Sequence, residues 1–182
     1  MMQIKRIGIV GAGQMGRGIA QVAMMSGFDV TLFDVDKENA NFAQQFIQKQ
    51  LKKGVEKGKR SQSPVDESLV ALTLFSDINS LADCDLLIEA ATENKSVKFE
   101  IFKQLDEIAK PDAILATNTS SISITEIAAV TNRAKQVAGM HFMNPVPVMK
   151  LVEGIRRLET SYDVFLIKLN GFPKKWGRPS SK

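Results

Sequence analysis

The sequence is poor in cysteine and histidine, with one of each among its 182 residues, Cys84 and His141. A single cysteine cannot form an internal disulfide, which is typical of a protein from a reducing cytoplasm. One cysteine and one histidine also offer few ligands for a transition metal, so we expect no metal site. Cys84 stands between Asp83 and Asp85, whose negative charges disfavour a thiolate, and we expect this thiol to be inert.

Long apolar runs are also absent. No stretch reaches the roughly 18 apolar residues that a membrane-spanning helix needs, and the first residues lack the apolar segment of a signal peptide. We therefore expect a soluble, cytoplasmic protein without a membrane partner. The length suits one domain of about 100–200 residues with a sizeable core, or one domain and a fragment of another.

Acidic residues are missing from the end of the sequence, and this explains the net charge of +4. Residues 164–182 contain five lysines and arginines and no acid, so that without these five charges the remainder carries −1. The positive charge therefore belongs to the last residues and not to the domain. Because no aromatic platform for stacking bases accompanies the other basic residues, we expect no nucleic-acid partner.

Glycines are concentrated at one informative place, residues 11–16, which read Gly-Ala-Gly-Gln-Met-Gly. This segment lies between an apolar run at 7–10 and a helical pattern over 14–26. A strand, a glycine turn and a helix N-terminus together present backbone N–H groups to a phosphate. Gly11 suits the tight turn, Gly13 the close approach of a pyrophosphate, and Gly16 the packing of helix on strand. With Gln14 and Met15, these residues form a candidate dinucleotide site.

Asp34 follows the next predicted strand, residues 28–33, and stands eighteen positions after Gly16. An acid about 20 residues beyond the glycine turn binds the ribose hydroxyls of a dinucleotide. Its charge would repel a 2′-phosphate, which favours NAD over NADP as the cofactor. The alternative is an ordinary strand-to-helix turn in which Asp34 is the N-cap of the following helix.

Helical and strand patterns alternate through the rest of the chain. The apolar spacing predicts helices over 37–51, 65–71, 97–108 and about 124–130, and strands over 72–75, 85–90, 113–117 and 136–140. We expect residues 61–64 to break the chain between two helices, and the helix over 97–108 follows from the spacing of Val97, Ile101, Phe102, Leu105 and Ile108. This alternation predicts an α/β fold with a doubly wound, Rossmann-like parallel sheet, whose ligands bind at the carboxyl ends of the strands.

Polar segments follow three of these strands, at residues 93–95, 118–121 and 141–147. A lone histidine at a strand end can be purely structural, but His141 stands at the edge of a sheet that is expected to bind NAD. Glu153 follows twelve residues later, where a returning strand would set its carboxylate beside the ring. An imidazole held by a carboxylate is a general base that can take a proton from an alcohol while hydride leaves for NAD. Ser120 can orient that alcohol.

Basic residues crowd the end of the helix predicted over 37–51. Lys49, Lys53 and Lys57 stand four residues apart, with Lys52, Lys59 and Arg60 nearby. Such a run is either a solvated helix face or a patch that binds the phosphates of a substrate.

Five stretches together resemble the N-terminal domain of the 3-hydroxyacyl-CoA dehydrogenase family, in particular its bacterial 3-hydroxybutyryl-CoA branch: residues 11–16, 34, 89–94, 118–121 and 141–153. The resemblance covers about residues 4–160. It implies NAD-dependent oxidation of an L-3-hydroxyacyl-CoA to the 3-oxoacyl-CoA, or the reverse reaction.

Roles for individual residues follow from this resemblance. It implies that His141 is the catalytic base, that Glu153 orients it, and that Ser120 contacts the 3-hydroxyl group beside the nicotinamide. It further implies NAD contacts for Glu93, Lys98 and Asn144, and contacts to the nucleotide end of coenzyme A for Lys53 and Lys57.

The resemblance stops near Thr160. Members of the family continue into a helical C-terminal domain of roughly a hundred residues, through which they form dimers and which supplies a catalytic asparagine. We therefore expect residues 1–160 to form the NAD-binding domain, and residues 161–182 an aberrant tail in place of the C-terminal domain. The homodimer contacts would be lost with that domain. An alternative function is thus an NAD-binding fragment with little or no turnover.

The tail carries one clue to its origin. It reads Trp-Gly-Arg-Pro at 176–179, where the family typically reads Met-Gly-Lys-Thr. The codons ATG GGG AAG ACC, read one base late, encode Trp-Gly-Arg-Pro. We hypothesise a frameshift between about Tyr162 and Phe172. A deliberately shortened chain and a natural short form are the alternatives.

Overall fold

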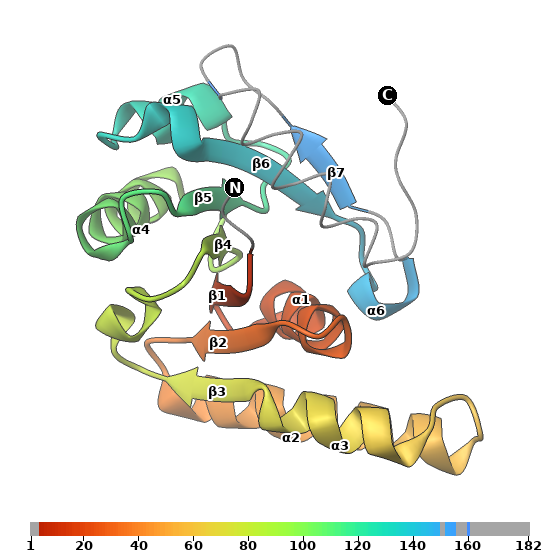
Figure 1. Cartoon of the computed structure of the whole chain (residues 1–182). Coiled ribbons are helices and arrows are strands. Elements are labelled where there is room, and N and C mark those ends of the chain that lie inside the picture. The colour runs from red at the N-terminus through yellow and green to blue at the C-terminus, as the bar shows by residue number, and fades with distance from the viewer. Residues whose placement is uncertain (1–3, 150–151, 156–159, 161–182) are drawn as a thin grey trace.

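A single mixed sheet forms the centre of the computed structural model, which describes residues 4–149, 152–155 and 160. Its strand order is β3-β2-β1-β4-β5-β6-β7 (Figure 1). The strands are β1 (Arg6–Val10), β2 (Asp29–Phe33), β3 (Leu72–Phe75), β4 (Leu86–Glu89), β5 (Ile114–Thr117), β6 (Val137–Phe142) and β7 (Val152–Ile155). β1 to β6 are parallel and β7 is antiparallel to β6. The predicted doubly wound, Rossmann-like fold is confirmed. The predicted tail, residues 161–182, lies outside the described residues.

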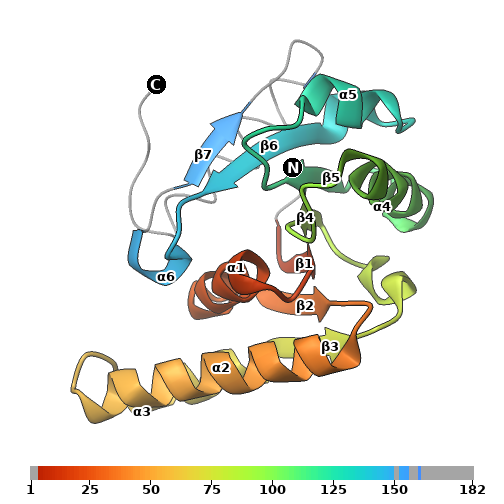
Figure 2. The same ribbon diagram turned by 180° about the vertical axis from the view of Figure 1, so that it is seen from behind.

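Helices cover both faces of the sheet (Figures 1 and 2). One face carries α1 (Gln14–Met25), α2 (Lys37–Glu56), α3 (Gln62–Val70) and α6 (Val146–Met149). The other face carries η1 (Ile78–Leu81), α4 (Lys95–Ile108) and α5 (Ile124–Ala129), and η2 (Ala134–Gln136) leads into β6. No helix in the described part of the chain is long and apolar enough to cross a membrane.

The strands are buried on both faces, and their side chains alternate between two cores. Ile7 and Ile9 of β1 enter the core under α1 and α2, whereas Val10 enters the core under α4. Leu86 and Leu87 of β4 divide in the same way. This burial on both faces explains why the strands read as continuous apolar runs.

α2 is longer than its apolar spacing predicts. It continues through Gly54 to Glu56 and ends before Gly58, whose φ of +67° is favourable only for glycine. A Cβ on Gly54 would stand 3.0 Å from Cδ of Arg60, so the glycine makes room for a side chain that folds back on the helix. A tertiary contact therefore explains a residue that weakens the helix locally.

α3 begins earlier than predicted. Residues 62–64 do not break the chain but form the first turn of the helix, with Ser61 at the N-cap position. Pro64 is tolerated in this turn because the N–H that proline lacks would have no partner within the helix. α2 and α3 lie side by side along β3 in both views (Figures 1 and 2).

α4 does not bury all of the apolar residues whose spacing predicts it. Val97 is 48% exposed, and the buried positions are instead Lys98, Phe102 and Leu105. The predicted helix is confirmed, but Val97, the first residue of the apolar spacing, is exposed while its neighbour Lys98 is buried.

Cys84 is a free, buried cysteine two residues before the start of β4. Burial raises the pKa of its thiol to about 11. Removal from water is the main cause of this rise and the charge of Asp85 a lesser one, and both disfavour the thiolate, in agreement with the expectation of an inert thiol.

Candidate functional site

The turn between β1 and α1 has the geometry of a dinucleotide-binding turn. Gly11 has a φ of +100°, and its N–H donates to the carbonyl oxygen of Phe33 at 2.8 Å. A Cβ on Gly16 would stand 1.7 Å from the carbonyl oxygen of Gly11, so only glycine lets the helix lie this close to the turn. The space beside Gly13 is open, with no atom within 4 Å of an added Cβ. The tight turn, the close packing and the open approach thus fall at the three predicted positions.

Asp34 follows the last residue of β2 and lies beside the same glycine turn. Its Oδ2 accepts a hydrogen bond from the Ala12 N–H at 2.8 Å, and its Oδ1 accepts one from the Asp36 N–H at 2.9 Å. The N-cap of α2 is Asp36, which accepts from the Glu38 N–H. The alternative interpretation of Asp34 as that N-cap is therefore wrong, and the carboxylate is held against the glycine turn.

These groups fit a dinucleotide cofactor. α1 has no side-chain cap at its N-terminus and no acid in its first turn, so no side chain satisfies the first N–H groups of this helix, and the space beside its N-cap Gly13 is open. That end of the helix suits a pyrophosphate, and the Asp34 carboxylate suits ribose hydroxyls. Gln14 lies in the first turn, where its Nε2 donates to Oδ1 of Asn144 at 3.4 Å, and Met15 packs partly buried against the core.

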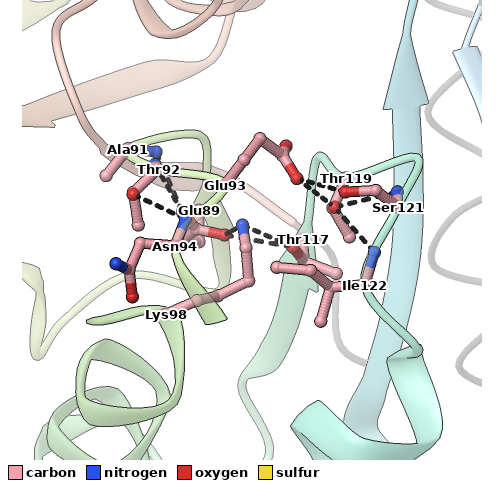
Figure 3. Close-up of polar contacts among 10 residues, drawn as sticks. All are labelled: Glu89, Ala91, Thr92, Glu93, Asn94, Lys98, Thr117, Thr119, Ser121 and Ile122. Atoms are coloured by element: carbon pink, nitrogen blue, oxygen red, sulfur yellow. Dashed lines mark hydrogen bonds and ion pairs between the residues drawn. The ribbon is translucent and has the colours of Figure 1, made fainter. Parts of the chain in front are cut away.

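A buried polar network lies under the loop that follows β4 (Figure 3). The side chains of Glu89 and Lys98 are both fully buried and form an ion pair. Thr117, at the end of β5, donates to Oε2 of Glu89 at 3.0 Å and accepts from Nζ of Lys98 at 3.4 Å. The structure thus places the Lys98 ammonium beneath the loop, and its predicted contact with NAD stays a prediction.

Glu93 joins this loop to the loop after β5. Its Oε2 accepts from the hydroxyl of Thr119 at 2.7 Å and from that of Ser121 at 2.8 Å (Figure 3). Ser120 lies between these two residues and is exposed. A single carboxylate therefore holds both chain neighbours of the serine that is predicted to contact substrate.

His141 and Glu153 face each other across the last two strands of the sheet. They are register partners in the antiparallel pair of β6 and β7, with Nδ1 of His141 3.4 Å from Oε2 of Glu153. The expected returning strand is present. The amide of Asn118 ties this end of β6 to the serine loop, because its Oδ1 accepts from the Phe142 N–H at 3.0 Å. The predicted catalytic residues therefore lie on neighbouring segments at one edge of the sheet.

Lys53 and Lys57 lie apart from this edge. Both are exposed, in the last turn of α2 and at its C-cap. Asp34 precedes the other end of α2, and at a rise of 1.5 Å per residue Lys53 lies about 24 Å from Lys37 along the helix. The basic residues are thus on a separate, solvent-facing part of the α2–α3 hairpin.

Sequence reasoning did not identify the roles of Glu89, Thr117, Thr119 and Ser121 in the polar contacts. One signal was available for the buried pair: a lysine at the first position of the series 98, 102, 105 stands on the apolar face of α4. Such a lysine requires a buried acid, and the acid at the end of the buried run 85–89 is the nearest candidate. No comparable local pattern marks the hydroxyl groups that contact Glu93.

Comparison with known proteins adds to this geometry. Residues 6–179 match the family model described as 3-hydroxyacyl-CoA dehydrogenase, NAD binding domain, which confirms NAD as the cofactor. A relative from Bacillus subtilis, "Probable 3-hydroxybutyryl-CoA dehydrogenase", is 51% identical over 165 residues, which are 91% of this chain and 58% of the relative. One of the same name from Deinococcus radiodurans is 50% identical over 156 residues, 86% of this chain and 56% of the relative.

A solved structure shows the same fold. The crystal structure of (S)-3-hydroxybutyryl-CoA dehydrogenase from Ralstonia eutropha is similar with a TM-score of 0.93 and 40% sequence identity, covering 97% of this chain and 62% of that one. The chain spans less than two thirds of the length of these relatives. By its sequence match and its fold, the chain belongs to the 3-hydroxyacyl-CoA dehydrogenase family, as an NAD-binding domain of that family.

Proposed function

We propose that the site serves the NAD-dependent oxidation of an L-3-hydroxyacyl-CoA, specifically 3-hydroxybutyryl-CoA, to the 3-oxoacyl-CoA, or the reverse reaction. The observation that carries this proposal is the pair of His141 and Glu153, which face each other across β6 and β7 at the edge of an NAD-binding sheet. Relatives whose names specify 3-hydroxybutyryl-CoA support the choice of substrate.

His141 is the general base in this proposal, and Glu153 orients it. When Nδ1 carries the ring proton and donates it toward Glu153, Nε2 is left as the acceptor for the proton of the substrate hydroxyl. The carboxylate stabilises the imidazolium that forms when this proton arrives. The side chain of His141 is 29% exposed, which leaves the ring accessible to a substrate. NAD, when bound, supplies the hydride acceptor for the oxidation.

Ser120 orients the substrate hydroxyl, and the loops around it hold the cofactor side of the site. Glu93 and Asn144 contact NAD in this proposal, and Lys53 and Lys57 contact the phosphates of coenzyme A. The exposed position of both lysines and their spacing of four residues on α2 support a role in binding an anion. Of the two interpretations of the basic run, we therefore propose the phosphate patch.

An assay of acetoacetyl-CoA reduction by NADH tests the reaction. The chain should oxidise NADH only when acetoacetyl-CoA is present, and His141→Asn should lower kcat by about 100-fold or more, as expected for loss of a general base. Glu153→Gln keeps a polar side chain of the same size and should lower kcat less. Equal rates for wild type and His141→Asn would contradict the role of His141.

A second candidate is NAD binding with little or no turnover. The observation that favours it is coverage, because the chain aligns with 58% of the Bacillus subtilis relative. In this candidate residues 1–160 bind NAD, but the acyl-CoA is not positioned well enough for hydride transfer. A calorimetric NAD titration followed by the acetoacetyl-CoA assay separates the two: binding without turnover supports the second candidate, and turnover supports the first.

A further inference from the structure

A groove of about 220 Å³ lies between α1, α2 and the segment that follows β6. α1 contributes Arg17 and Gln21 to its wall, α2 contributes Phe46 and Gln50, and residues 144–148 form the third side. α1, α2 and α6 cover the same face of the sheet, with α6 packed against α1 (Figures 1 and 2). A molecule in this groove would therefore meet apolar side chains interrupted by amide groups and one guanidinium.

The guanidinium of Arg17 is held in place by aromatic rings. Its Cζ lies 4.3 Å from the ring centroid of Phe46 and 5.4 Å from that of Phe42. Such contacts fix the position of the charge and leave N–H donors for an acceptor. Within the part of the chain that the structure describes, the Arg17 side chain has no hydrogen bond and no ion pair. It is thus charged, positioned and available to an acceptor on a ligand.

Gln21 stands one helical turn after Arg17 and lines the same groove. The residue is only 6% exposed, and its side-chain amide makes no hydrogen bond to another of the described residues. Buried polar side chains in native proteins almost always have a hydrogen-bond partner. An amide group on a ligand would satisfy both ends of this side chain, because it offers a carbonyl oxygen to the NH₂ group and an N–H to the oxygen.

The groove lies between the two ends of the proposed acyl-CoA site. Asn144, on one side, stands three residues after His141. Gln50, on α2, stands one helical turn, about 5 Å, before Lys53. In the proposed function the acyl group lies at His141 and the nucleotide phosphates at Lys53. The part of the substrate that joins them is the pantetheine arm, a chain of short aliphatic stretches and amide groups. Its chemistry matches that of the groove.

Resting on the proposed function, we propose that Arg17 and Gln21 bind the pantetheine arm of the acyl-CoA. The Arg17 guanidinium, held over Phe46, donates to an amide carbonyl oxygen of the arm, and the Gln21 amide pairs with an amide group of the same arm. Both residues act on substrate binding and not on hydride transfer. Lys53 bears on the phosphates instead, so the helices α1 and α2 recognise different parts of one substrate.

Binding titrations of the full chain, followed by its backbone NMR signals, test this inference. The ligands are acetoacetyl-CoA and acetoacetyl-pantetheine, each with NAD present, which cannot reduce them, so no turnover is needed. Arg17→Met removes the N–H donors and should raise the Kd of both ligands by about tenfold, as expected for loss of a hydrogen bond from a charged group. Lys53→Ala/Lys57→Ala should raise the Kd of acetoacetyl-CoA alone.

Gln21→Met provides a second variant with a distinctive pair of results. It should raise the Kd of both ligands by about threefold or more, because a ligand amide loses its partner. It should also raise the melting temperature, because methionine replaces a buried amide that has no described partner. A lower melting temperature with unchanged Kd values would make Gln21 a structural residue and overturn its part in the inference.

Lys103→Met is the control for the loss of one positive charge. Lys103 lies on α4, on the other face of the sheet, and its side chain is exposed. Both Kd values should stay at those of wild type. A rise in this variant equal to that in Arg17→Met would show that net charge alone governs binding, and would overturn the inference.

The two ligands also separate this inference from the proposed reaction. A rise in Kd for acetoacetyl-CoA alone in Arg17→Met would place Arg17 on the nucleotide, and unchanged Kd values for both ligands would deny it a role in binding. Either result overturns the inference, as does a wild-type chain that binds neither ligand. A chain that binds both ligands without oxidising NADH refutes the proposed reaction and leaves the inference supported.

Discussion

Gly11 lies in direct contact with Ala91, so closely that a single added methyl group would stand 2.6 Å from the Ala91 Cα. The β1–α1 turn and the loop after β4 therefore pack directly on each other, although eighty residues separate them. The glycine turn at 11–16 and the loop that leads to Glu93, which is predicted to contact NAD, therefore depend on each other's position.

Alanine substitutions in the turn should separate stability from cofactor binding. Gly11→Ala should lower both, because its φ of +100° is unfavourable for alanine and the methyl group meets the loop. We expect a cost of about 1–3 kcal/mol in unfolding free energy. Gly13→Ala should leave the melting temperature unchanged, since the added methyl group meets no atom. It should lower the affinity for NAD, because the methyl group fills the space for the pyrophosphate. Thermal unfolding and NAD calorimetry measure the two effects.

A third glycine serves as the control for these variants. Gly27 has a φ of +83° after α1, and no atom lies near an added Cβ. Gly27→Ala should therefore cost stability through backbone strain alone, with NAD affinity retained. If Gly27→Ala lowered NAD affinity as much as Gly13→Ala, the lower affinity of Gly13→Ala could not be assigned to the pyrophosphate position.

The sequence predicted those parts of the site whose residues lie close together along the chain. The glycine turn and Asp34 follow from spacing within one strand-helix-strand unit. The pairing of His141 with Glu153 follows from a return of only twelve residues. The Glu89–Lys98–Thr117 network was not predicted: the lysine among the apolar positions of α4 signals a buried acid, but its pairing with Glu89 and Thr117 also depends on the register of β4 and β5 and on the rotation of α4.

Glu93 provides a second prediction. Its carboxylate holds the hydroxyls of Thr119 and Ser121 on both sides of Ser120. Glu93→Ala should release this loop and lower the kcat of acetoacetyl-CoA reduction by about tenfold, because misplacement of an orienting group costs rate. The melting temperature should change little, since Glu93 is exposed. Thr119→Val and Ser121→Ala each remove one of the two hydrogen bonds and should have smaller effects. An unchanged kcat in all three variants would refute the role of Glu93.

Stability should fall in acid because of two carboxylates with lowered pKa values, Asp85 directly before β4 and Asp106 in the last turn of α4. Burial raises the pKa of Asp85, but the Arg6 and Lys5 amides and the Lys110 ammonium outweigh it and hold this pKa below its usual range. Asp106 behaves likewise, with burial opposed by Asn132 and Arg133. A lowered pKa in the folded state stabilises the fold at pH values above the unfolded value, about 3.9, and this stabilisation is lost as the pH falls through the folded value.

Urea unfolding at pH 5 and pH 3 measures this loss. The unfolding free energy of wild type should be lower at pH 3. In Asp85→Asn/Asp106→Asn the decrease should be smaller, because neither side chain of the variant takes up a proton. A decrease as large as that of wild type would assign the acid sensitivity to other carboxylates.

Arg133 should contribute to stability by capping the end of α4. Its guanidinium donates to the carbonyl oxygens of Asp106, Ala109 and Lys110 as well as to the Asp106 carboxylate. Arg133→Ala should lower the unfolding free energy by about 2 kcal/mol, because it leaves these acceptors without their charged donor. Denaturant unfolding at neutral pH measures this cost, and a loss below about 0.5 kcal/mol would be typical of a surface pair instead.

The basic end of α2 provides a last prediction, on the nucleotide part of the substrate. Lys53 and Lys57 are exposed and one helical turn apart, so both can face one phosphate group. Lys53→Ala/Lys57→Ala should raise the KM for acetoacetyl-CoA by about tenfold at low salt and by less at high salt, because exposed charges are screened. Acetoacetyl-pantetheine lacks the nucleotide, and its KM should be the same in wild type and variant. An equal rise in KM for both substrates would show that the lysines act on the fold or on the acyl site, and the basic run would then be a solvated helix face.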